Sequence, residues 1–350
     1  MKRITRTLLD WYQKNKILYP WRLTADPYRI WLSEILLQQT RIPVALPFFN
    51  RIVAKYPSLE DVARESQESF VAEWSGIGYY SRARNMHACA RELVSNHQQK
   101  FPSSYEQLTK LPGIGRYTAG ALRNVCFDEL TPAIDGNTGR VLARLTLNDL
   151  NPTSKEYLAR LEESYLNIGK DASPGELFQA LMELGEQVCL PQPDCLHCPV
   201  RNYCLAFKKN MQTAIPRKKI RKRAEPYYWY FLLLQNSESF YLIQNARRSF
   251  LRDAWLFPDL LLQEKLNDAE LISEFQKRWG INVRNLTNVG SVSHSVTFRK
   301  IQAIVMHAQD FTIEDCNGKW ISPDTVSSIH TSSVLRKILR LCGYWRIILS

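Results

Sequence analysis

The stretch Leu111-Pro112-Gly113-Ile114-Gly115-Arg116-Tyr117-Thr118-Ala119 decides the fold of the first part of this chain. On both sides of it, apolar residues recur every three or four positions, which is the spacing of amphipathic helices. Its two glycines permit a tight turn with positive backbone φ. Such a turn exposes backbone N–H groups at the start of the second helix, where they favour a phosphate anion. We therefore expect Gly113 and Gly115 to bind phosphate, with Arg116 as an added positive charge.

The complete string is more specific than a lone Gly-x-Gly, which is usually only a turn. A hydrophobic residue, Pro, Gly, another hydrophobic residue and Gly between two helices form the helix-hairpin-helix pattern, which binds DNA backbones without reading their sequence. Helical spacing extends through residues 1–207, as in ITRTLLDWYQ, IWLSEILLQQT, RARNMHACARELV and YTAGALRNVCF. We therefore predict that residues 1–207 are all-α.

The pattern of residue types changes after residue 226. YYWYFLLLQ, SFYLIQN, SVTFRK and IQAIVMHAQ are rich in aromatic and β-branched residues and predict strands, whereas DAELISEFQKRW and SSVLRKILRLC predict helices. Between the two parts, residues 208–226 carry eight basic and one acidic side chains and two prolines, which is typical of a linker. The prediction is a multidomain protein: an all-α domain over 1–207, a basic linker over 208–226 and a smaller α+β domain over 227–350.

Length and charge limit the class of protein. The chain has 350 residues and a net charge of +12, and no apolar run approaches the ~18 residues that span a bilayer. We expect no membrane association, no signal peptide and a cytoplasmic, nucleoid-associated location. The excess charge lies mostly in the linker, which is either a solubilising tether or a segment that follows DNA phosphates. Its candidate phosphate contacts are Arg217, Lys218, Lys219, Arg221, Lys222 and Arg223.

Four cysteines, Cys189, Cys195, Cys198 and Cys204, follow the spacing C-x5-C-x2-C-x5-C. Disulfides are not expected, because the chain shows no export signal. Zinc sites usually combine two C-x2-C pairs, and only one is present. The wide outer gaps favour a [4Fe–4S] cluster, with zinc as the alternative.

Two carboxylates are candidate catalytic groups. Glu34 lies among apolar residues in WLSEILLQQT, and burial there would raise its pKa and make it a general acid. Asp135 precedes the helical run VLARL, where a helix N-cap stays ionised. One protonated and one ionised carboxyl is the pairing that hydrolyses glycosidic bonds. Most glutamates are simply solvent-facing and most such aspartates are simply caps, and nothing in the spacing brings the two together.

Taken in order, the motifs resemble one family over residues 1–207: WLSEILLQQT, GIGYYSRARN, LPGIGRYTAG, DGN, QALMELG and the four cysteines. They resemble the bacterial adenine DNA glycosylases, the MutY family. The resemblance implies a helix-hairpin-helix glycosylase fold with a [4Fe–4S] loop, in a six-helix lobe over 25–130 and an iron–sulfur lobe over 1–24 plus 131–207. It also implies a NUDIX-like 8-oxoguanine recognition domain over 227–350. The expected protein is a monomeric, monofunctional adenine DNA glycosylase of base-excision repair. Its expected partner is double-stranded DNA with adenine mispaired with 8-oxoguanine or guanine.

The resemblance assigns roles motif by motif. Catalysis falls to Glu34, which protonates the adenine, to Asp135, which stabilises the sugar oxocarbenium, and to Tyr117 and Asn137, which support that step. The remaining assignments are an adenine pocket of Trp21, Arg22 and Glu183, DNA contacts by Gln38, Tyr79, Gly113, Gly115 and Arg116, and 8-oxoguanine recognition by Ser293 and His294.

Two alternatives and some departures accompany this assignment. An endonuclease III-like glycosylase/lyase needs a lysine nucleophile, and that position here is Tyr117; that family also has Gln where this chain has Glu34. A non-catalytic DNA-binding iron–sulfur or zinc protein would not need Glu34 and Asp135 together.

This chain departs from the family pattern in three places. The gap between Cys189 and Cys195, LPQPD, is one residue shorter than is usual in the family and lacks a basic side chain. Val292 stands where the family typically has Phe, and no NUDIX hydrolase motif is found near DAELISEFQKRWG.

Overall fold

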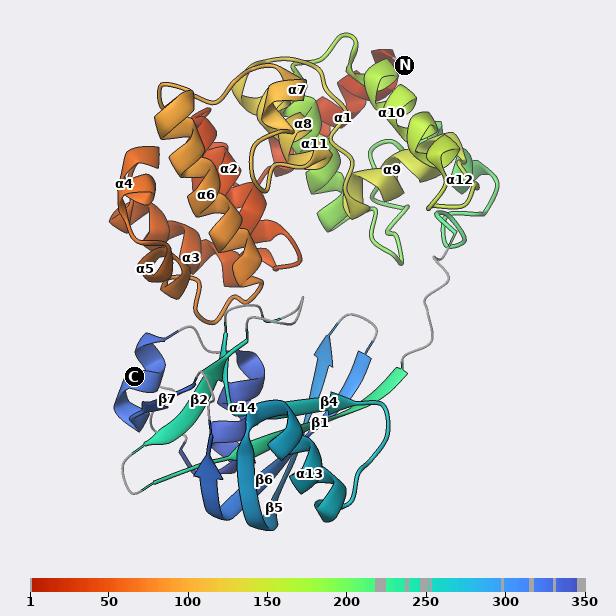
Figure 1. Cartoon of the computed structure of the whole chain (residues 1–350). Coiled ribbons are helices and arrows are strands. Elements are labelled where there is room, and N and C mark those ends of the chain that lie inside the picture. Colours follow the sequence, from red (N-terminus) through yellow and green to blue (C-terminus); the bar gives the residue numbers. More distant parts are fainter. Residues whose placement is uncertain are drawn as a thin grey trace. The chain divides into compact units, whose positions relative to one another are not determined.

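Helices fill the first part of the chain as far as Lys208, and strands begin at Glu225 (Figure 1). The computed structural model divides into two compact units, one formed by Met1–Gln67 and Ser81–Ile220, the other by Glu68–Tyr80 and Arg221–Ser350. The structure describes residues 2–217, 225–236, 239–245, 251, 254–296, 299–314, 318–329 and 332–344. Outside these ranges lie five of the predicted linker contacts: Lys218, Lys219, Arg221, Lys222 and Arg223.

The helices of the first part begin and end at sequence signals. Asp26, for example, accepts a hydrogen bond from the backbone N–H of Tyr28 at 3.1 Å and starts a helix whose first residue is Pro27. None of the described helices is both long and apolar enough to cross a membrane. In chain order they are α1 (Lys2–Asn15), η1 (Pro20–Arg22), α2 (Pro27–Leu37), α3 (Ile42–Lys55), α4 (Leu59–Arg64), α5 (Gln67–Ala72), α6 (Tyr80–Asn96), α7 (Tyr105–Leu108), α8 (Arg116–Cys126), α9 (Gly136–Thr146), α10 (Lys155–Gly169), α11 (Pro174–Gln187), η2 (Arg201–Tyr203) and α12 (Leu205–Lys208).

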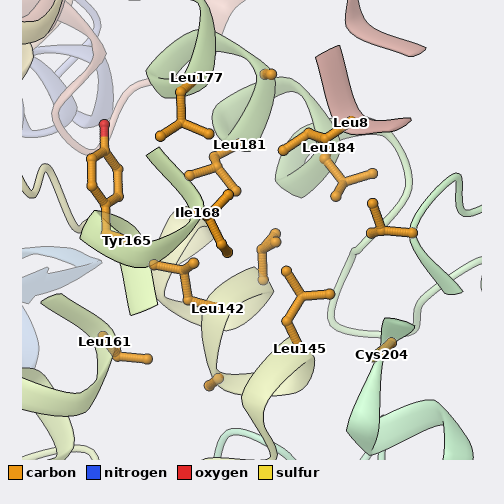
Figure 2. Close-up of a cluster of buried hydrophobic side chains, with 14 of the residues drawn as sticks. Leu8, Leu142, Leu145, Leu161, Tyr165, Ile168, Leu177, Leu181, Leu184 and Cys204 are labelled. Atoms are coloured by element: carbon orange, nitrogen blue, oxygen red, sulfur yellow. The ribbon is translucent and has the colours of Figure 1, made fainter. Parts of the chain in front are cut away.

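One hydrophobic core joins the first helix to the later ones. Leu8 of α1, Leu142 of α9, Tyr165 of α10 and Leu181 of α11 are fully buried against one another (Figure 2). Burial of this size stabilises the packing by about 1.5–3 kcal/mol per large apolar side chain. Cys204 lies at the edge of the same cluster, so the segment that carries the cysteines is packed against the core.

The second part combines two sheets with helices. A four-stranded sheet has the order β4-β1-β6-β5, in which β1 and β6 are parallel, and a three-stranded sheet has the order β3-β2-β7. The elements are β1 (Glu225–Leu233), β2 (Phe240–Gln244), β3 (Trp255–Leu256), β4 (Asp259–Leu262), α13 (Asp268–Trp279), β5 (Ile281–Val296), β6 (Arg299–Ile313), β7 (Gly318–Ile321), η3 (Pro323–Ser328) and α14 (Ser333–Leu341).

Side chains of β1 contribute to two hydrophobic clusters, because successive side chains of a strand point to opposite faces of the sheet. Trp229 and Phe231 of β1 pack into a cluster with Leu335 of α14. Tyr230 of β1 packs into a second cluster with Phe275 of α13. The predicted succession of an all-α part and a mixed part is therefore confirmed, and α13 covers the predicted helix DAELISEFQKRW residue for residue.

Candidate active site

A small cavity in the first unit brings several of the predicted site residues together. Its volume is about 40 Å³. Residues from η1, α2 and α11 contribute most of its wall, with Ile42 of α3 and Val125 of α8. They are Trp21, Arg22, Ile30, Ser33, Glu34, Leu37, Ile42, Val125, Phe178, Gln179, Met182 and Glu186. The wall is thus apolar with a few polar groups, which is the usual composition of a small-molecule site.

Glu34 is the acidic group of α2 in this cavity. Residues 31–36 of α2 are buried apart from Glu34, which is partly exposed. Burial raises the pKa of Glu34 to about 7. A hydrogen bond with Tyr117 and the charge of Arg22 lower that pKa, while the charge of Asp135 raises it. Glu34, Tyr117 and Asp135 therefore lie close enough to act on one another, although they come from three different helices.

Asp135 is the N-cap of α9. Its Oδ1 accepts hydrogen bonds from the backbone N–H groups of Asn137 at 3.0 Å and Thr138 at 2.8 Å, and from the Thr138 hydroxyl at 2.9 Å. All three donors contact Oδ1, and within the described residues Oδ2 accepts no hydrogen bond. The carboxylate is therefore held in one orientation with one oxygen available.

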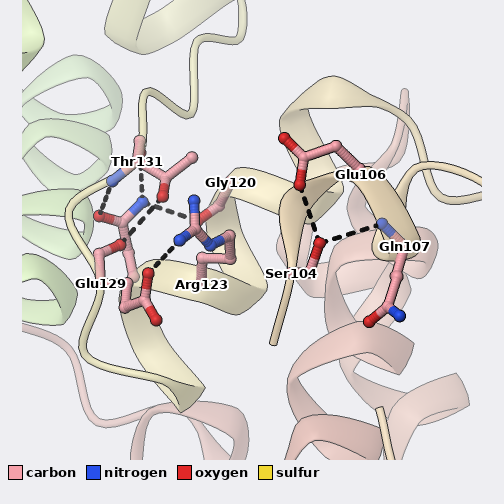
Figure 3. Close-up of polar contacts among 8 residues, drawn as sticks. Ser104, Glu106, Gln107, Gly120, Arg123, Glu129 and Thr131 are labelled. Carbon is pink, nitrogen blue, oxygen red and sulfur yellow. Dashed lines mark hydrogen bonds and ion pairs between the residues drawn. The ribbon is translucent and has the colours of Figure 1, made fainter. Parts of the chain in front are cut away.

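Close packing of α8 against the loop before α9 fixes Asp135 relative to Tyr117. A Cβ at Gly120 of α8 would lie 2.6 Å from the carbonyl oxygen of Pro132. Asn124, also on α8, donates to the Thr131 carbonyl at 2.6 Å and to the Gly120 carbonyl at 2.7 Å. Figure 3 shows this loop, with Arg123 and Glu129 forming an ion pair at its base.

Asn137 is fixed from two sides. A Cβ at Gly185 of α11 would lie 2.9 Å from the Cβ of Asn137, so only glycine permits this approach. Arg140 donates to Asn137 Oδ1 at 3.0 Å, to the Gly185 carbonyl at 2.8 Å and to the Cys189 carbonyl at 2.7 Å. One guanidinium thus connects the start of α9, the end of α11 and the first cysteine.

The predicted adenine pocket is present only in part. Trp21 is buried, stacks on Tyr19 at 5.1 Å and lies edge-on to Phe49, and both Trp21 and Arg22 line the cavity. Glu183 is not part of the cavity wall: it is 1% exposed and forms an ion pair with Arg22. Glu183 thus contacts Arg22, which lines the cavity, and its assignment to the adenine pocket stays a prediction.

Sequence inspection missed two polar residues of the cavity wall, Gln179 and Glu186. Both lie on the face of α11 that also carries Phe178 and Met182. Positions 178, 179, 182 and 186 follow the helical period, but Glu183, four residues after 179 and three before 186, follows it as well, so the period alone does not show which of them line the cavity.

In the helix-hairpin-helix turn, the expected positive φ is found at Gly113, whereas Gly115 has φ −90°. Gly113 has φ +76°, and a Cβ there would lie 2.8 Å from the Cβ of Asn85. Gly115 is the N-cap of α8 and provides no side-chain cap, so no cap side chain occupies the first N–H groups of α8. Arg116 is engaged with Glu162 of α10 at 2.5 Å on the exposed surface.

The two residues assigned to intrude into DNA lie at helix ends. Gln38 follows α2, and its carbonyl accepts from Arg82 of α6 at 2.5 Å. The same guanidinium donates to the carbonyls of Ile35 and Leu36, so Arg82 provides hydrogen-bond donors for the carbonyl groups at the C-terminal end of α2. Tyr79 precedes α6, has φ +54° and is 54% exposed.

The four cysteines surround one small cavity together with Arg144 of α9. All four are free thiols, and burial raises the pKa of Cys198 to about 12. Arg144 donates to the Cys189 sulfur at 3.4 Å and to the Leu190 carbonyl at 2.5 Å. Among the residues that the structure describes, no group of three or more His, Cys, Asp or Glu side chains is arranged to hold a metal ion.

Ser293 and His294 lie in β5. His294 is 8% exposed, its ring lies 6.1 Å from that of Trp229, and burial lowers its pKa. Its Nε2 has no hydrogen-bond partner in the described part of the chain. Lys337 of α14 donates to the Ser293 carbonyl at 2.7 Å.

Comparisons with known proteins agree on one family. Residues 32–165 match the HhH-GPD superfamily of base excision DNA repair proteins. An adenine DNA glycosylase of Buchnera aphidicola subsp. Baizongia pistaciae (strain Bp) is 31% identical over 78% of this chain and 81% of the relative. The adenine DNA glycosylase of Mus musculus is 28% identical over 95% of this chain and 76% of the relative. The solved structure of a thermostable thymine-DNA glycosylase matches with a TM-score of 0.53 and 27% identity, over 59% of this chain and 96% of that one.

Proposed function

Because the chain belongs to the adenine DNA glycosylase family and hydrolyses N-glycosyl bonds, we propose that its substrate is adenine mispaired with 8-oxoguanine or guanine in double-stranded DNA. Glu34 is the general acid and Asp135 stabilises the oxocarbenium. The observation that carries the assignment is the cavity that contains Glu34, whose pKa of about 7 keeps part of the carboxyl protonated at neutral pH.

The proposed chemistry uses the two carboxyls in turn. Glu34 gives its proton to a ring nitrogen of adenine, and the C1′–N9 bond breaks with its electron pair leaving on the protonated base. The positive charge left on the sugar is stabilised by Asp135, whose free Oδ2 is available because Oδ1 holds the three donors of α9. Glu34, now ionised, accepts a proton from the water that adds to C1′. The products are free adenine and an abasic site.

The base must leave the helix before this reaction, since a stacked base is out of reach. We assign Gln38 and Tyr79 to fill the gap and the α8 N-terminus, with Gly113 and Gly115, to bind a backbone phosphate. Tyr117 has no amine for a Schiff base, so the glycosylase/lyase alternative is not favoured.

We further propose that the second unit is a NUDIX-like domain that contacts 8-oxoguanine through Ser293 and His294. The buried, unpartnered Nε2 of His294 and the lysine bond to Ser293 support it. Replacing Ser293 by Ala should slow adenine removal opposite 8-oxoguanine but not opposite guanine, with Ser291→Ala as the matched control. Equal effects on both duplexes would contradict the assignment.

The four cysteines fit a [4Fe–4S] cluster better than a single zinc ion. Zinc sites usually combine two C-x2-C pairs, and these four cysteines contain one, between Cys195 and Cys198. A larger cluster separates its ligands more widely, and four free thiols around one cavity provide the thiolates that it needs. The cysteines would hold the cluster, which would fix the segment that follows α11.

Single-turnover cleavage of duplexes with adenine opposite 8-oxoguanine, guanine, cytosine or thymine tests the proposed function. Rates should be highest opposite 8-oxoguanine and guanine. Glu34→Gln should abolish adenine release while binding to the duplex is retained. Equal rates opposite all four bases would reject the mispair preference, and full activity of Glu34→Gln would reject the catalytic assignment.

A further inference from the structure

Gln212 is a polar residue in the wall of the cavity that the four cysteines surround, and the proposed chemistry does not use it. It lies in the turn after α12, where the backbone N–H of Ala214 donates to the Met211 carbonyl at 3.0 Å. The Met211 side chain packs against the hydrophobic core, and the Ile215 carbonyl accepts from Arg144 at 2.8 Å. The turn is therefore fixed on both sides of Gln212, which defines the place of this side chain in the wall.

The side-chain amide of Gln212 contains an unpaired atom. Its Oε1 is buried and has no hydrogen-bond partner within the described residues. Buried polar atoms in folded proteins almost always have a partner, and an exception calls for a group that binds beside it. The four cysteines point to the [4Fe–4S] cluster as that group.

The other polar side chains of this wall already have partners. Arg201 donates to a backbone carbonyl at 3.1 Å, and Asp194 accepts a hydrogen bond from a histidine ring nitrogen at 2.7 Å. Arg144, which is only 3% exposed, donates to backbone carbonyls and, at 3.4 Å, to the Cys189 sulfur. Apart from the cysteines, Gln212 is therefore the polar side chain of the wall that is left to contact a bound group.

The sulfur atoms around this cavity accept hydrogen bonds from the chain. Cys189 accepts from Arg144, and backbone N–H groups donate to Cys198 and Cys204. For Cys195, burial and neighbouring charges are the largest influences, and they raise its pKa. The sulfurs of an iron–sulfur cluster carry negative charge and also accept hydrogen bonds, and such bonds help to set its reduction potential. A further donor in this wall would therefore find sulfur acceptors.

We propose that the side-chain N–H2 group of Gln212 donates a hydrogen bond to a sulfur of the bound cluster and thereby raises its reduction potential. The two ends of an amide have nearly the same shape, so a half-turn about the last side-chain bond exchanges Oε1 for the nitrogen in the same space. Reduction adds one negative charge to the cluster, and a donor stabilises this form more than the oxidised form. The inference rests on the proposed cofactor, which the four cysteines would hold.

The test measures the one-electron reduction potential of the cluster by electrochemistry of the purified full-length protein, after its iron content has been determined. Gln212→Met keeps a similar volume but removes the donor. It should lower the reduced-to-oxidised ratio at a fixed potential about tenfold, which corresponds to a shift of about 59 mV to lower potential. Gln212→Glu places a carboxylate beside the sulfurs and should lower the potential further than Gln212→Met.

Thr213→Val is the matched control, since Thr213 is exposed in the same turn and does not belong to the cavity wall. Its iron content and potential should equal those of the wild type. An unchanged or higher potential in Gln212→Met would overturn the inference. Loss of iron from both Gln212 variants would also overturn it, because the residue would then hold the cluster in place rather than set its potential. If only one variant loses its iron, the potential of the other decides.

The same measurements separate this inference from the proposed cofactor. A wild-type protein with one zinc and no iron would reject the cluster itself. A wild-type protein with about four irons and a potential that does not respond to Gln212→Met would reject only the role of Gln212.

Discussion

At the scale of single residues, opposing influences set the proton affinity of Glu34. Burial and the charge of Asp135 raise its pKa, and the hydrogen bond with Tyr117 lowers it, so that the result lies at about 7. The apolar neighbours of Glu34 in the sequence indicate burial, and burial is the largest of these influences. The contributions of Tyr117 and Asp135 could not be predicted, because they depend on how α2, α8 and α9 pack together.

The rate of adenine removal should depend on pH through this group. A general acid works in its protonated form, which is present below its pKa and lost above it. We expect the single-turnover rate to be constant at pH 5–6 and to fall as the pH rises through about 7. A rate profile from pH 5 to 9 checks this expectation. A rate that rises through pH 7 would show that Glu34 does not act as the acid.

Tyr117→Phe should move that fall to higher pH. The substitution removes the hydrogen bond that lowers the pKa of Glu34, so the carboxyl would keep its proton to higher pH. The same rate profile measures the shift, and Tyr165→Phe, in the distant core, is the control that should leave it in place. A shift to lower pH would contradict the role given to Tyr117.

At the scale of elements, α9 connects two sites through its two arginines. Its N-terminus holds Asp135 and Asn137, and Arg140 and Arg144, one turn apart, bind the segment around Cys189. From the sequence alone, these two arginines would be interpreted as solvent-facing charged residues of an amphipathic helix. The partners that connect them to Gly185 and to the segment around Cys189 lie more than forty residues away, so no local pattern reveals these contacts.

Arg140→Leu should weaken both the fold and catalysis. It leaves the carbonyl of Gly185 without its side-chain donor, at a cost of about 1–3 kcal/mol, and leaves the carbonyl of Cys189 with only the 3.4 Å bond from Arg144. We expect a lower melting temperature and at least a tenfold slower adenine release, because Asn137 loses its support. Thermal unfolding and single-turnover rates check both effects. Arg160→Leu, on the exposed side of α10, should change neither, and a fully active Arg140→Leu would contradict this coupling.

The bounds of a helix or strand could be predicted from the sequence where its intrinsic secondary-structure propensity agrees with its packing in the fold. The helix α13 has a complete capping box at Asn267 and Glu270 and apolar residues on one face, and its bounds followed from the sequence. The long strand β5 was missed over most of its length, because INVRNLTNVGSV contains three asparagines and a glycine. Its pairing with β6 holds it extended, with a bulge between Asn288 and Gly290.

At the scale of the whole molecule, the order of motifs along the chain was enough to predict the family and the helical and mixed parts. The proximity of Glu34 and Asp135 could not be predicted, because it depends on tertiary packing. The sequence also could not show that Glu186 rather than Glu183 lines the cavity, because both residues are acidic and both lie on α11.

The basic linker should make binding to DNA sensitive to salt. Affinity for DNA falls as the salt concentration rises, and each phosphate contact makes the slope of log affinity against log salt concentration steeper by roughly 0.9. Replacing Arg217, Lys218, Lys219, Arg221, Lys222 and Arg223 by Gln should flatten that slope, measured by binding titrations of a duplex at several salt concentrations. An unchanged slope would leave the segment as a tether. In the structure Arg217 pairs with Asp149 at 3.1 Å on the surface.

The purified protein should contain iron. We expect a brown protein with about four irons per chain by elemental analysis. Replacing Cys198 by Ser should reduce the iron content and the melting temperature together, whereas Cys89→Ser, away from this site, should leave the iron content unchanged. One zinc and no iron in the wild type would refute the cluster.

The volume of the active-site cavity, about 40 Å³, has a consequence for the rate of adenine release. Small-molecule pockets usually measure at least roughly 300 Å³, so a purine enters only after the walls around Trp21 and Met182 have moved apart. Catalysis is then scaled by the fraction of time spent in the wider form. The narrow cavity therefore predicts that adenine release depends on how readily its walls move apart, as well as on the chemistry at Glu34.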